Sequence, residues 1–337
     1  MGIVWSVGKM LAMTNIMRCS AAGVVLAGVL FLAGCSSNTS TSSTAAPAPR
    51  PAGTKLKVTA TIAMIGDVAQ RIGGDKAEVS ILMGPGTDPH LYKAREEDYR
   101  QLDAADVVLY NGLNLEGKMG DQLLKLAKKK AAAKKGSVVA VTESIDEKLF
   151  REPEEMDGHF DPHLWFDVSL WMKAAEKIRD TLVEADAANA GTYKANAEKL
   201  LKEMSELHEW CKKEIASIPK EQRVLITAHD AFGYFGRAYD IEVHGIQGIS
   251  TEDQASMAGI KNLVDLLVKR KVKAVFVESS VPKKNIEALV EGCKAAGHNV
   301  TVGGELFSDA MGDAGTKEGT YLGMVRHNVE TIVKALK

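Results

Sequence analysis

The chain has 337 residues, which is more than one small core usually holds and predicts two domains. Hydrophobic residues make up 45% and charged residues 26%, so most of the chain can form an ordinary globular interior. Lys and Arg total 42 against 44 acidic residues, and the net charge of -2 gives no reason to expect a nucleic-acid partner. Four cysteines are too few for a disulfide scaffold.

Residues 1–34 have the pattern of a secretory signal peptide. Lys9 and Arg18 precede an apolar run over 21–33, which is shorter than the about 20 residues needed to span a bilayer. The run ends in Leu-Ala-Gly-Cys, which resembles the bacterial lipobox and predicts cleavage before a lipidated Cys35. An ordinary cysteine after a signal is the alternative. Three methionines are further candidates for the true start: Met10, Met13 and Met17.

Residues 35–54 are expected to form a flexible tether. They are mostly Ser, Thr, Ala and Pro, with Arg50 as the only charged residue, and no core can be built from them. A tether behind a lipid anchor places the folded part at the outer side of the cell membrane or in the periplasm, attached to the membrane without entering it.

From Lys55 onward, short runs rich in β-branched residues alternate with helical patterns. This alternation predicts an α/β fold, in which helices cover both faces of parallel sheets. The expected strands of the first half are 56–62, 78–83, 105–110 and 137–141, and those of the second half are 224–227, 242–243, 274–277 and 300–302.

A long helical pattern separates the two halves. Apolar residues recur every three or four positions from Tyr193 to Ile215. Asp186 is the expected N-cap, and Pro219 ends the pattern. The folded part is therefore divided into an N-terminal lobe over 55–185, a connecting helix over 186–217 and a C-terminal lobe over 218–337.

The tripeptide Asp-Pro-His occurs twice, ending at His90 and at His163. Proline fixes its own φ and favours extended geometry in the preceding residue, so each histidine backbone is held stiffly. A stiff backbone suits a ligand that must not collapse inward when its site is empty. His90 also follows the strand 78–83, near the carboxyl end where open α/β sheets place ligand sites.

Two further candidates follow strands of the second half, His229 after 224–227 and Asp309 after 300–302. A cleft between the lobes would then collect three imidazoles and one carboxylate. Zinc accepts this set in tetrahedral geometry, whereas manganese prefers more oxygen ligands. Zn²⁺ is favoured, and Mn²⁺ stays open because a bidentate aspartate or a water raises the coordination number. Imidazole must be neutral to bind, so affinity is expected to fall as pH falls through about 6.

Other residues give weaker signals. Glu278 ends the strand 274–277 and is a candidate to orient a ligand histidine, because ligated imidazoles usually have such a partner. Cys211 and Cys293 either pair in an oxidising compartment or remain two buried thiols. No esterase elbow, P-loop or zinc-protease motif occurs in the sequence, so no catalytic residue is predicted.

Five segments of the chain resemble the cluster A-I metal-binding lipoproteins, the substrate-binding proteins of zinc and manganese ABC importers. They are residues 86–92, 161–167, 227–235, 245–253 and 303–315. The last of them, Gly-Gly-Glu-Leu-Phe-Ser-Asp-Ala-Met-Gly-Asp-Ala-Gly, is very similar to the TroA-like branch. The resemblance spans residues 55–337.

The resemblance implies a fold, a ligand set and a partner. The fold is two lobes, each with a four-stranded parallel sheet, joined by one long helix. The ligands fall on His90, His163, His229 and Asp309, and the partner is an ABC permease that receives the ion from a monomeric binding protein. Histidine at the third position favours zinc, because manganese-specific members usually have Glu there. The short segment 152–160 departs from dedicated zinc members, which often carry a long His-rich loop.

Two other functions are weighed against metal delivery. A secreted metallohydrolase needs an open coordination position and a general base, for which Glu278 is the candidate. Four protein ligands would fill a tetrahedron and argue against it. A surface adhesin is known in the family, but no residue of this chain supports that role independently.

Overall fold

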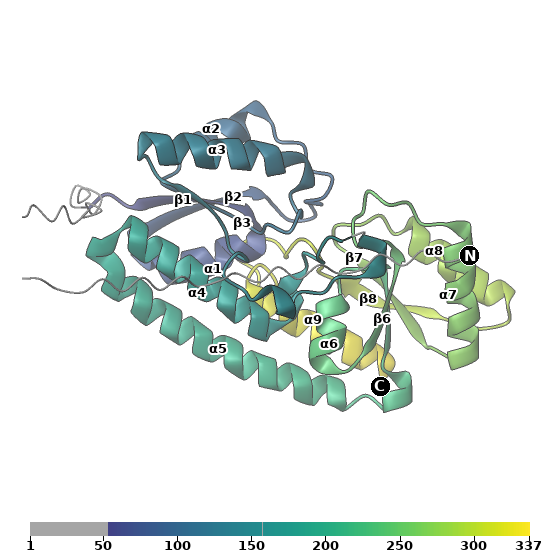
Figure 1. The fold of residues 1–337 in the computed structure, drawn as a ribbon. Coiled ribbons are helices and arrows are strands. Elements are labelled where there is room, and N and C mark those ends of the chain that lie inside the picture. The colour runs from purple at the N-terminus through teal and green to yellow at the C-terminus, as the bar shows by residue number, and fades with distance from the viewer. Residues whose placement is uncertain (1–52, 157) are drawn as a thin grey trace, which may run out of the picture. The chain divides into compact units, whose positions relative to one another are not determined.

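The computed structural model describes residues 53–156 and 158–337 (Figure 1). The predicted signal peptide, the lipidation site Cys35 and nearly all of the tether lie outside the described residues. Within the described part, no helix combines the length and the apolar character needed to cross a membrane.

The N-terminal half is built on one parallel sheet. Its strands are β1 (Leu56–Ile62), β2 (Ala77–Met83), β3 (Val107–Tyr110) and β4 (Ser137–Ala140), in the order β2-β1-β3-β4. Six of the seven residues of β1 are buried, as expected for a central strand covered on both faces. All four strands had been predicted, with boundaries within two residues of those observed.

Helices cover both faces of this sheet (Figure 1). One layer consists of α1 (Ala63–Gly73) and α4 (Val168–Ala185), and the other of α2 (Glu96–Ala104) and α3 (Gly120–Ala133). The carboxyl end of β1 leads directly into α1, whereas β2 is followed by a loop that carries the first Asp-Pro-His tripeptide.

The C-terminal half also has four strands, β5 (Val224–His229), β6 (Glu242–Gln247), β7 (Ala274–Glu278) and β8 (Thr301–Leu306). They form two parallel pairs, β5-β6 and β7-β8, with β5 beside β7. The expected four-stranded sheet is therefore present as two hydrogen-bonded pairs. At the carboxyl ends of β5 and β7 a side chain joins the pairs, because the Glu278 carboxylate accepts the backbone N–H of His229 at 2.9 Å.

Alternate residues of these strands enter two separate cores, as the period of a strand requires. Val224 and Ile226 pack toward α7 (Met257–Arg270) and α8 (Lys284–Ala295). Leu225 faces the other core, which is continuous with the N-terminal half. The helices α6 (Gly233–Tyr239) and α9 (Tyr321–Leu336) lie near α5 (Figure 1).

The long helix α5 (Ala190–Ala216) contacts helices of both halves. Its 27 residues make a rod of about 40 Å. The helix begins later than predicted, because Asp186 ends α4 and a 3₁₀ turn over Ala187–Asn189 intervenes. The Asp186 carboxylate accepts hydrogen bonds from Asn189 and Tyr193 instead of capping α5. The predicted apolar stripe is buried: Tyr193, Ala197, Leu200, Met204, Leu207, Cys211 and Ile215.

We expect Leu207→Ala to lower the free energy of unfolding by about 2–5 kcal/mol, because it leaves a cavity in a fully buried stripe. Glu206→Ala, at the exposed neighbouring position, is the matched control and should change it by less than about 0.5 kcal/mol. Urea unfolding followed by circular dichroism measures both. Equal effects of the two substitutions would show that the stripe does not hold the helix.

Candidate metal centre

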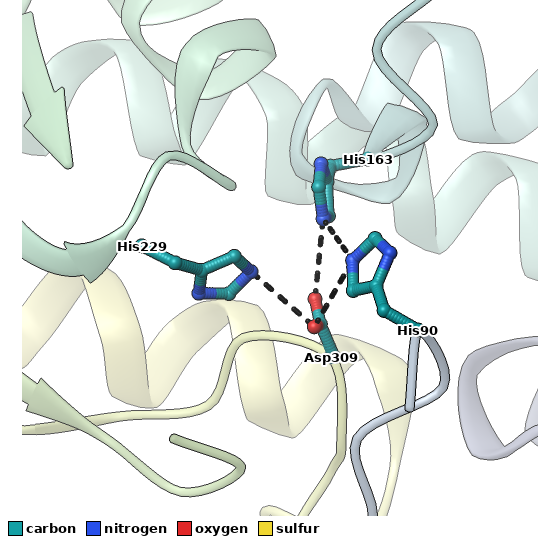
Figure 2. Close-up of side chains that lie close together, drawn as sticks. All are labelled: His90, His163, His229 and Asp309. Carbon is teal, nitrogen blue, oxygen red and sulfur yellow. Dashed lines mark hydrogen bonds and ion pairs between the residues drawn. The ribbon is translucent and has the colours of Figure 1, made fainter. Parts of the chain in front are cut away.

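Four side chains that are far apart in the sequence meet at one point (Figure 2). One ligand atom from each of His90, His163, His229 and Asp309 lies within 4.8 Å of all the others, and all four residues are buried. The Nε2 atoms of His90 and His163 are 3.3 Å apart. The carboxylate of Asp309 lies 3.6 Å from Nε2 of His90, 3.4 Å from that of His163 and 3.3 Å from that of His229.

Each half of the molecule contributes two of these side chains. His90 lies in the loop after β2, and His163 directly precedes the 3₁₀ turn Leu164–Phe166. His229 is the last residue of β5, and Asp309 follows β8 by three residues. The structure therefore brings together all four residues that the sequence singled out.

Both Asp-Pro-His tripeptides fold into the same local turn. In the first, the Asp88 carboxylate accepts the backbone N–H of His90 at 2.9 Å, and in the second Asp161 accepts that of His163 at 3.0 Å. The sequence predicted that proline holds the backbone of each histidine stiffly. The structure adds a second reason, because the aspartate closes the turn and fixes the histidine backbone.

Two of the imidazole rings are oriented by a carboxylate. Nδ1 of His163 lies 2.8 Å from Asp161, and Nδ1 of His229 lies 2.5 Å from Glu278. Each contact points the Nε2 atom of its ring at the centre (Figure 2). Glu278 had been a candidate for this contact. Asp161 had been missed, although its place two residues before His163 was a usable signal.

The centre contains buried polar atoms that lack a hydrogen-bond partner of acceptable geometry among the described residues. These atoms are both carboxylate oxygens of Asp309 and Nε2 of His229. A buried carboxylate without donors is costly unless a charge balances it. Three imidazole nitrogens and such a carboxylate form a donor set that suits a divalent transition metal.

The pKa values of the two histidines that end the Asp-Pro-His turns shift in opposite directions. Burial lowers the pKa of His90 to about 3. Burial acts on His163 in the same direction, but the carboxylates of Asp161 and Asp309 outweigh it and raise the pKa of His163 to about 9. Before a metal binds, His90 is therefore neutral at pH 7 and His163 carries a proton.

The other two residues behave as a coupled pair. Burial opposes the charge on His229, but Glu278 and Asp309 outweigh it and hold the pKa of His229 well above its usual value. Burial likewise opposes the charge on Asp309, and His229 and His163 outweigh it and hold the pKa of Asp309 well below its usual value. The ionised aspartate thus faces two protonated rings.

Two aromatic residues, Trp165 and Tyr321, connect the loops around the centre through hydrogen bonds and a ring contact. Trp165 donates its indole N–H to the carbonyl of Ser308 at 3.1 Å, next to Asp309. Tyr321 donates to the carbonyl of Trp165 at 2.8 Å, and the Trp165 and His163 rings meet edge to face. The loop of the second tripeptide and the loop of Asp309 are therefore held at a fixed distance.

Several other groups that could bind a ligand lie outside the metal centre. The remaining described histidines lie outside the cluster, namely His159, His208, His244, His298 and His327. Cys211 and Cys293 are both free and buried, so the alternative of two thiols is the correct one. A cavity of about 750 Å³ lies near the amino-terminal ends of β3 and β4, lined by residues at the ends of α2, α3 and α4, and none of the four clustered residues lines it.

Comparisons with known proteins agree with this geometry. Residues 58–335 match the model of the family described as zinc-uptake complex component A, periplasmic. The chain is 47% identical over 322 residues to the manganese-binding lipoprotein MntA of Bacillus subtilis, covering 95% of this chain and 100% of that protein. It is 46% identical over 281 residues to the zinc-binding protein TroA of Treponema pallidum, covering 83% and 88%.

A solved structure shares the fold. The periplasmic zinc-binding protein TroA from Treponema pallidum superposes with a TM-score of 0.80 at 45% identity, covering 84% of this chain and 99% of that one. The family model and these relatives cover nearly all of the described residues. The chain therefore belongs to the zinc-uptake component A family, as a TroA-like metal-binding substrate-binding protein of ABC importers.

Proposed function

We propose that His90, His163, His229 and Asp309 bind one divalent transition-metal ion as cargo, which the protein delivers to an ABC importer. The observation that carries this proposal is the spacing of the donor atoms. In a tetrahedral complex with bonds of about 2.0–2.1 Å, neighbouring donors lie about 3.3–3.4 Å apart. The three distances between ring nitrogens and the Asp309 carboxylate, and the distance between the Nε2 atoms of His90 and His163, run from 3.3 to 3.6 Å, and all four donors lie within 4.8 Å of one another.

We propose zinc as the favoured ion and manganese as the alternative. Three imidazoles and one carboxylate match the preference of Zn²⁺, while Mn²⁺ prefers a larger share of oxygen. Both oxygens of Asp309 lack hydrogen-bond partners in the described part of the chain, so a bidentate contact would add a fifth ligand. Relatives named for zinc and for manganese are almost equally similar to this chain.

We further propose that the protein is a monomer held at the outer face of the membrane through lipid on Cys35. The lipobox-like Leu-Ala-Gly-Cys supports the anchor. Relatives named as metal ABC transporter substrate-binding lipoproteins, such as SsaB of Streptococcus sanguinis at 31% identity over 283 residues, support the same place and partner. The partner is the permease of a metal importer together with its ATPase.

Metal analysis tests the choice of ion. Protein purified without added metal is expected to contain about one zinc per chain, and equimolar zinc should displace bound manganese in a competition experiment. Elemental analysis of the protein after dialysis measures both. Retention of manganese against equimolar zinc would overturn the zinc assignment, and failure to retain either ion would overturn the metal site.

The metallohydrolase alternative finds no support at this centre. Glu278 had been its candidate general base, but one of its oxygens accepts the backbone N–H of His229 and the other contacts Nδ1 of the same residue. Four protein donors also leave a tetrahedral ion no open position for water. The adhesin alternative likewise has no residue of the described chain in its favour.

A further inference from the structure

Arg151 lies in the N-terminal half, twelve positions before His163, and pairs with the carboxylate that orients that histidine. The Asp161 side chain is fully buried and uses both oxygens. Oδ1 takes the backbone N–H and Nδ1 of His163, and Oδ2 takes the guanidinium of Arg151. The backbone N–H of Asp161 also donates to the carbonyl of Arg151 at 2.9 Å. The guanidinium, the carboxylate and the imidazole thus form one chain of contacts that ends at the metal centre.

The opposite side of Arg151 rests on the C-terminal half. A Cβ atom added to Gly233, the first residue of α6, would lie 1.3 Å from Nη1 of Arg151, and its three nearest atoms all belong to that guanidinium. Glycine therefore leaves open the space in which the arginine lies. The next residue, Tyr234, accepts the backbone N–H of Arg151 at 3.0 Å and donates its hydroxyl to the carbonyl of Asp161 at 2.9 Å.

These contacts matter because a buried carboxylate that serves as the partner of a ligand histidine must keep its position and its charge. The Arg151 side chain is 26% exposed and Asp161 is not exposed at all, so the arginine is the cation that balances this carboxylate from the solvent side. Charge-assisted pairs of this kind add directional as well as electrostatic hold. Without the guanidinium, Oδ2 of Asp161 would lose this partner, and the carboxylate would be free to turn away from the His163 ring.

We propose that Arg151 is a positioning residue for the metal ligand His163, acting through Asp161, and that Gly233 of the opposite half holds Arg151 in place. This inference rests on the metal site proposed above. The orientation of the His163 ring would then depend on contact between the two halves. If α6 moved away, the Arg151–Asp161 pair would lose its contacts with Gly233 and with the Tyr234 hydroxyl.

The test uses the full chain and cobalt(II) as a probe, since tetrahedral cobalt absorbs in the visible range. Arg151→Gln is expected to loosen Asp161 and thereby lower cobalt and zinc affinity by up to about 10- to 100-fold, the effect of losing the direct partner of a ligand, and to change the cobalt spectrum. Arg151→Lys keeps the charge without the planar guanidinium and should recover part of the loss. Unchanged affinity and an unchanged spectrum in Arg151→Gln would overturn the proposal.

Gly233→Ala gives an independent variant in which the arginine is still present. Because the new Cβ meets only the flexible end of Arg151, the helix backbone need not move and the fold is expected to survive. Its affinity should fall as in Arg151→Gln, and the double variant should bind no more weakly than about the weaker single variant. Losses that multiply in the double variant would show that Gly233 does not act through Arg151.

Arg237→Gln is the matched control. Arg237 also lies against the Tyr234 ring, but it donates to the carbonyl of Leu149 at 2.8 Å and not to Asp161. Its affinity should stay within about threefold of the unmodified protein, the scatter allowed for a site with no ligand contact. The unmodified protein is titrated first: if it binds no cobalt or zinc, the proposed function fails as well, whereas binding with equal affinity in all variants defeats only the role of Arg151.

Discussion

Zinc binding is expected to weaken by about 10²- to 10⁴-fold when Asp309 is replaced by alanine, since losing one member of a buried charge pair costs about 3–5 kcal/mol. Asp309 is the only carboxylate in the cluster of four, and it approaches the Nε2 atom of every histidine. Its removal would leave a dication among three neutral rings in a buried site. Competition with a chelator of known affinity measures the loss.

Asp309→Asn separates charge from shape. The amide keeps an oxygen donor of the same size, so its affinity should lie between that of Asp309→Ala and that of the unmodified protein. Asp313→Ala is the control, because Asp313 is exposed and follows in the same loop. An affinity for Asp309→Ala that stays within tenfold of the control would remove this carboxylate from the site.

The four clustered residues could be predicted because each carries a local signal. His90 and His163 end a repeated tripeptide whose backbone is stiff, and His229 and Asp309 lie at the carboxyl ends of predicted strands. In parallel sheets such ends gather at one edge. Local patterns also predicted the position of strands in both halves, most clearly for β1, β5 and β7, whose residues are buried on both faces and read as continuous apolar runs.

Contacts between residues distant in sequence could not be predicted in the same way. Nothing in the local pattern of Gly233 indicates that a guanidinium from Arg151 occupies the space where a side chain would lie. The start of α5 was misplaced for a related reason: Asp186 has the residue type of an N-cap, but the Tyr193 hydroxyl and the Asn189 amide compete for its carboxylate. In both places the observed structure depends on a contact with another residue, and residue propensities carry no information about such contacts.

The pH dependence of binding follows from the charges of the site before metal arrives. The pKa of His163 is raised to about 9 and that of His229 lies well above its usual value, so both rings carry protons at pH 7. A divalent ion must displace these two protons, because only neutral imidazole coordinates. The exchange leaves the total charge of the buried centre unchanged, because two protons leave when one divalent ion binds.

Affinity is therefore expected to fall as pH falls, beginning near pH 9 and not only near the value of about 6 that an unperturbed imidazole would give. Each proton released adds about tenfold per pH unit, so zinc affinity should drop by up to about 100-fold per unit between pH 8 and pH 6. Calorimetry in buffers of different ionisation enthalpy counts the protons directly, and about two should be released per zinc at pH 7.

Asp161→Asn provides the matched variant for this dependence. The Asp161 carboxylate is one of the two groups that raise the pKa of His163 against the effect of burial. Its neutral amide should lower that pKa, so fewer protons would be released per zinc at pH 7 and the slope would fall from about 100-fold toward about tenfold per unit. Equal zinc affinity at pH 8 and pH 6 in the unmodified protein would contradict the protonated centre, because a site that exchanges metal for protons must lose affinity as protons become abundant.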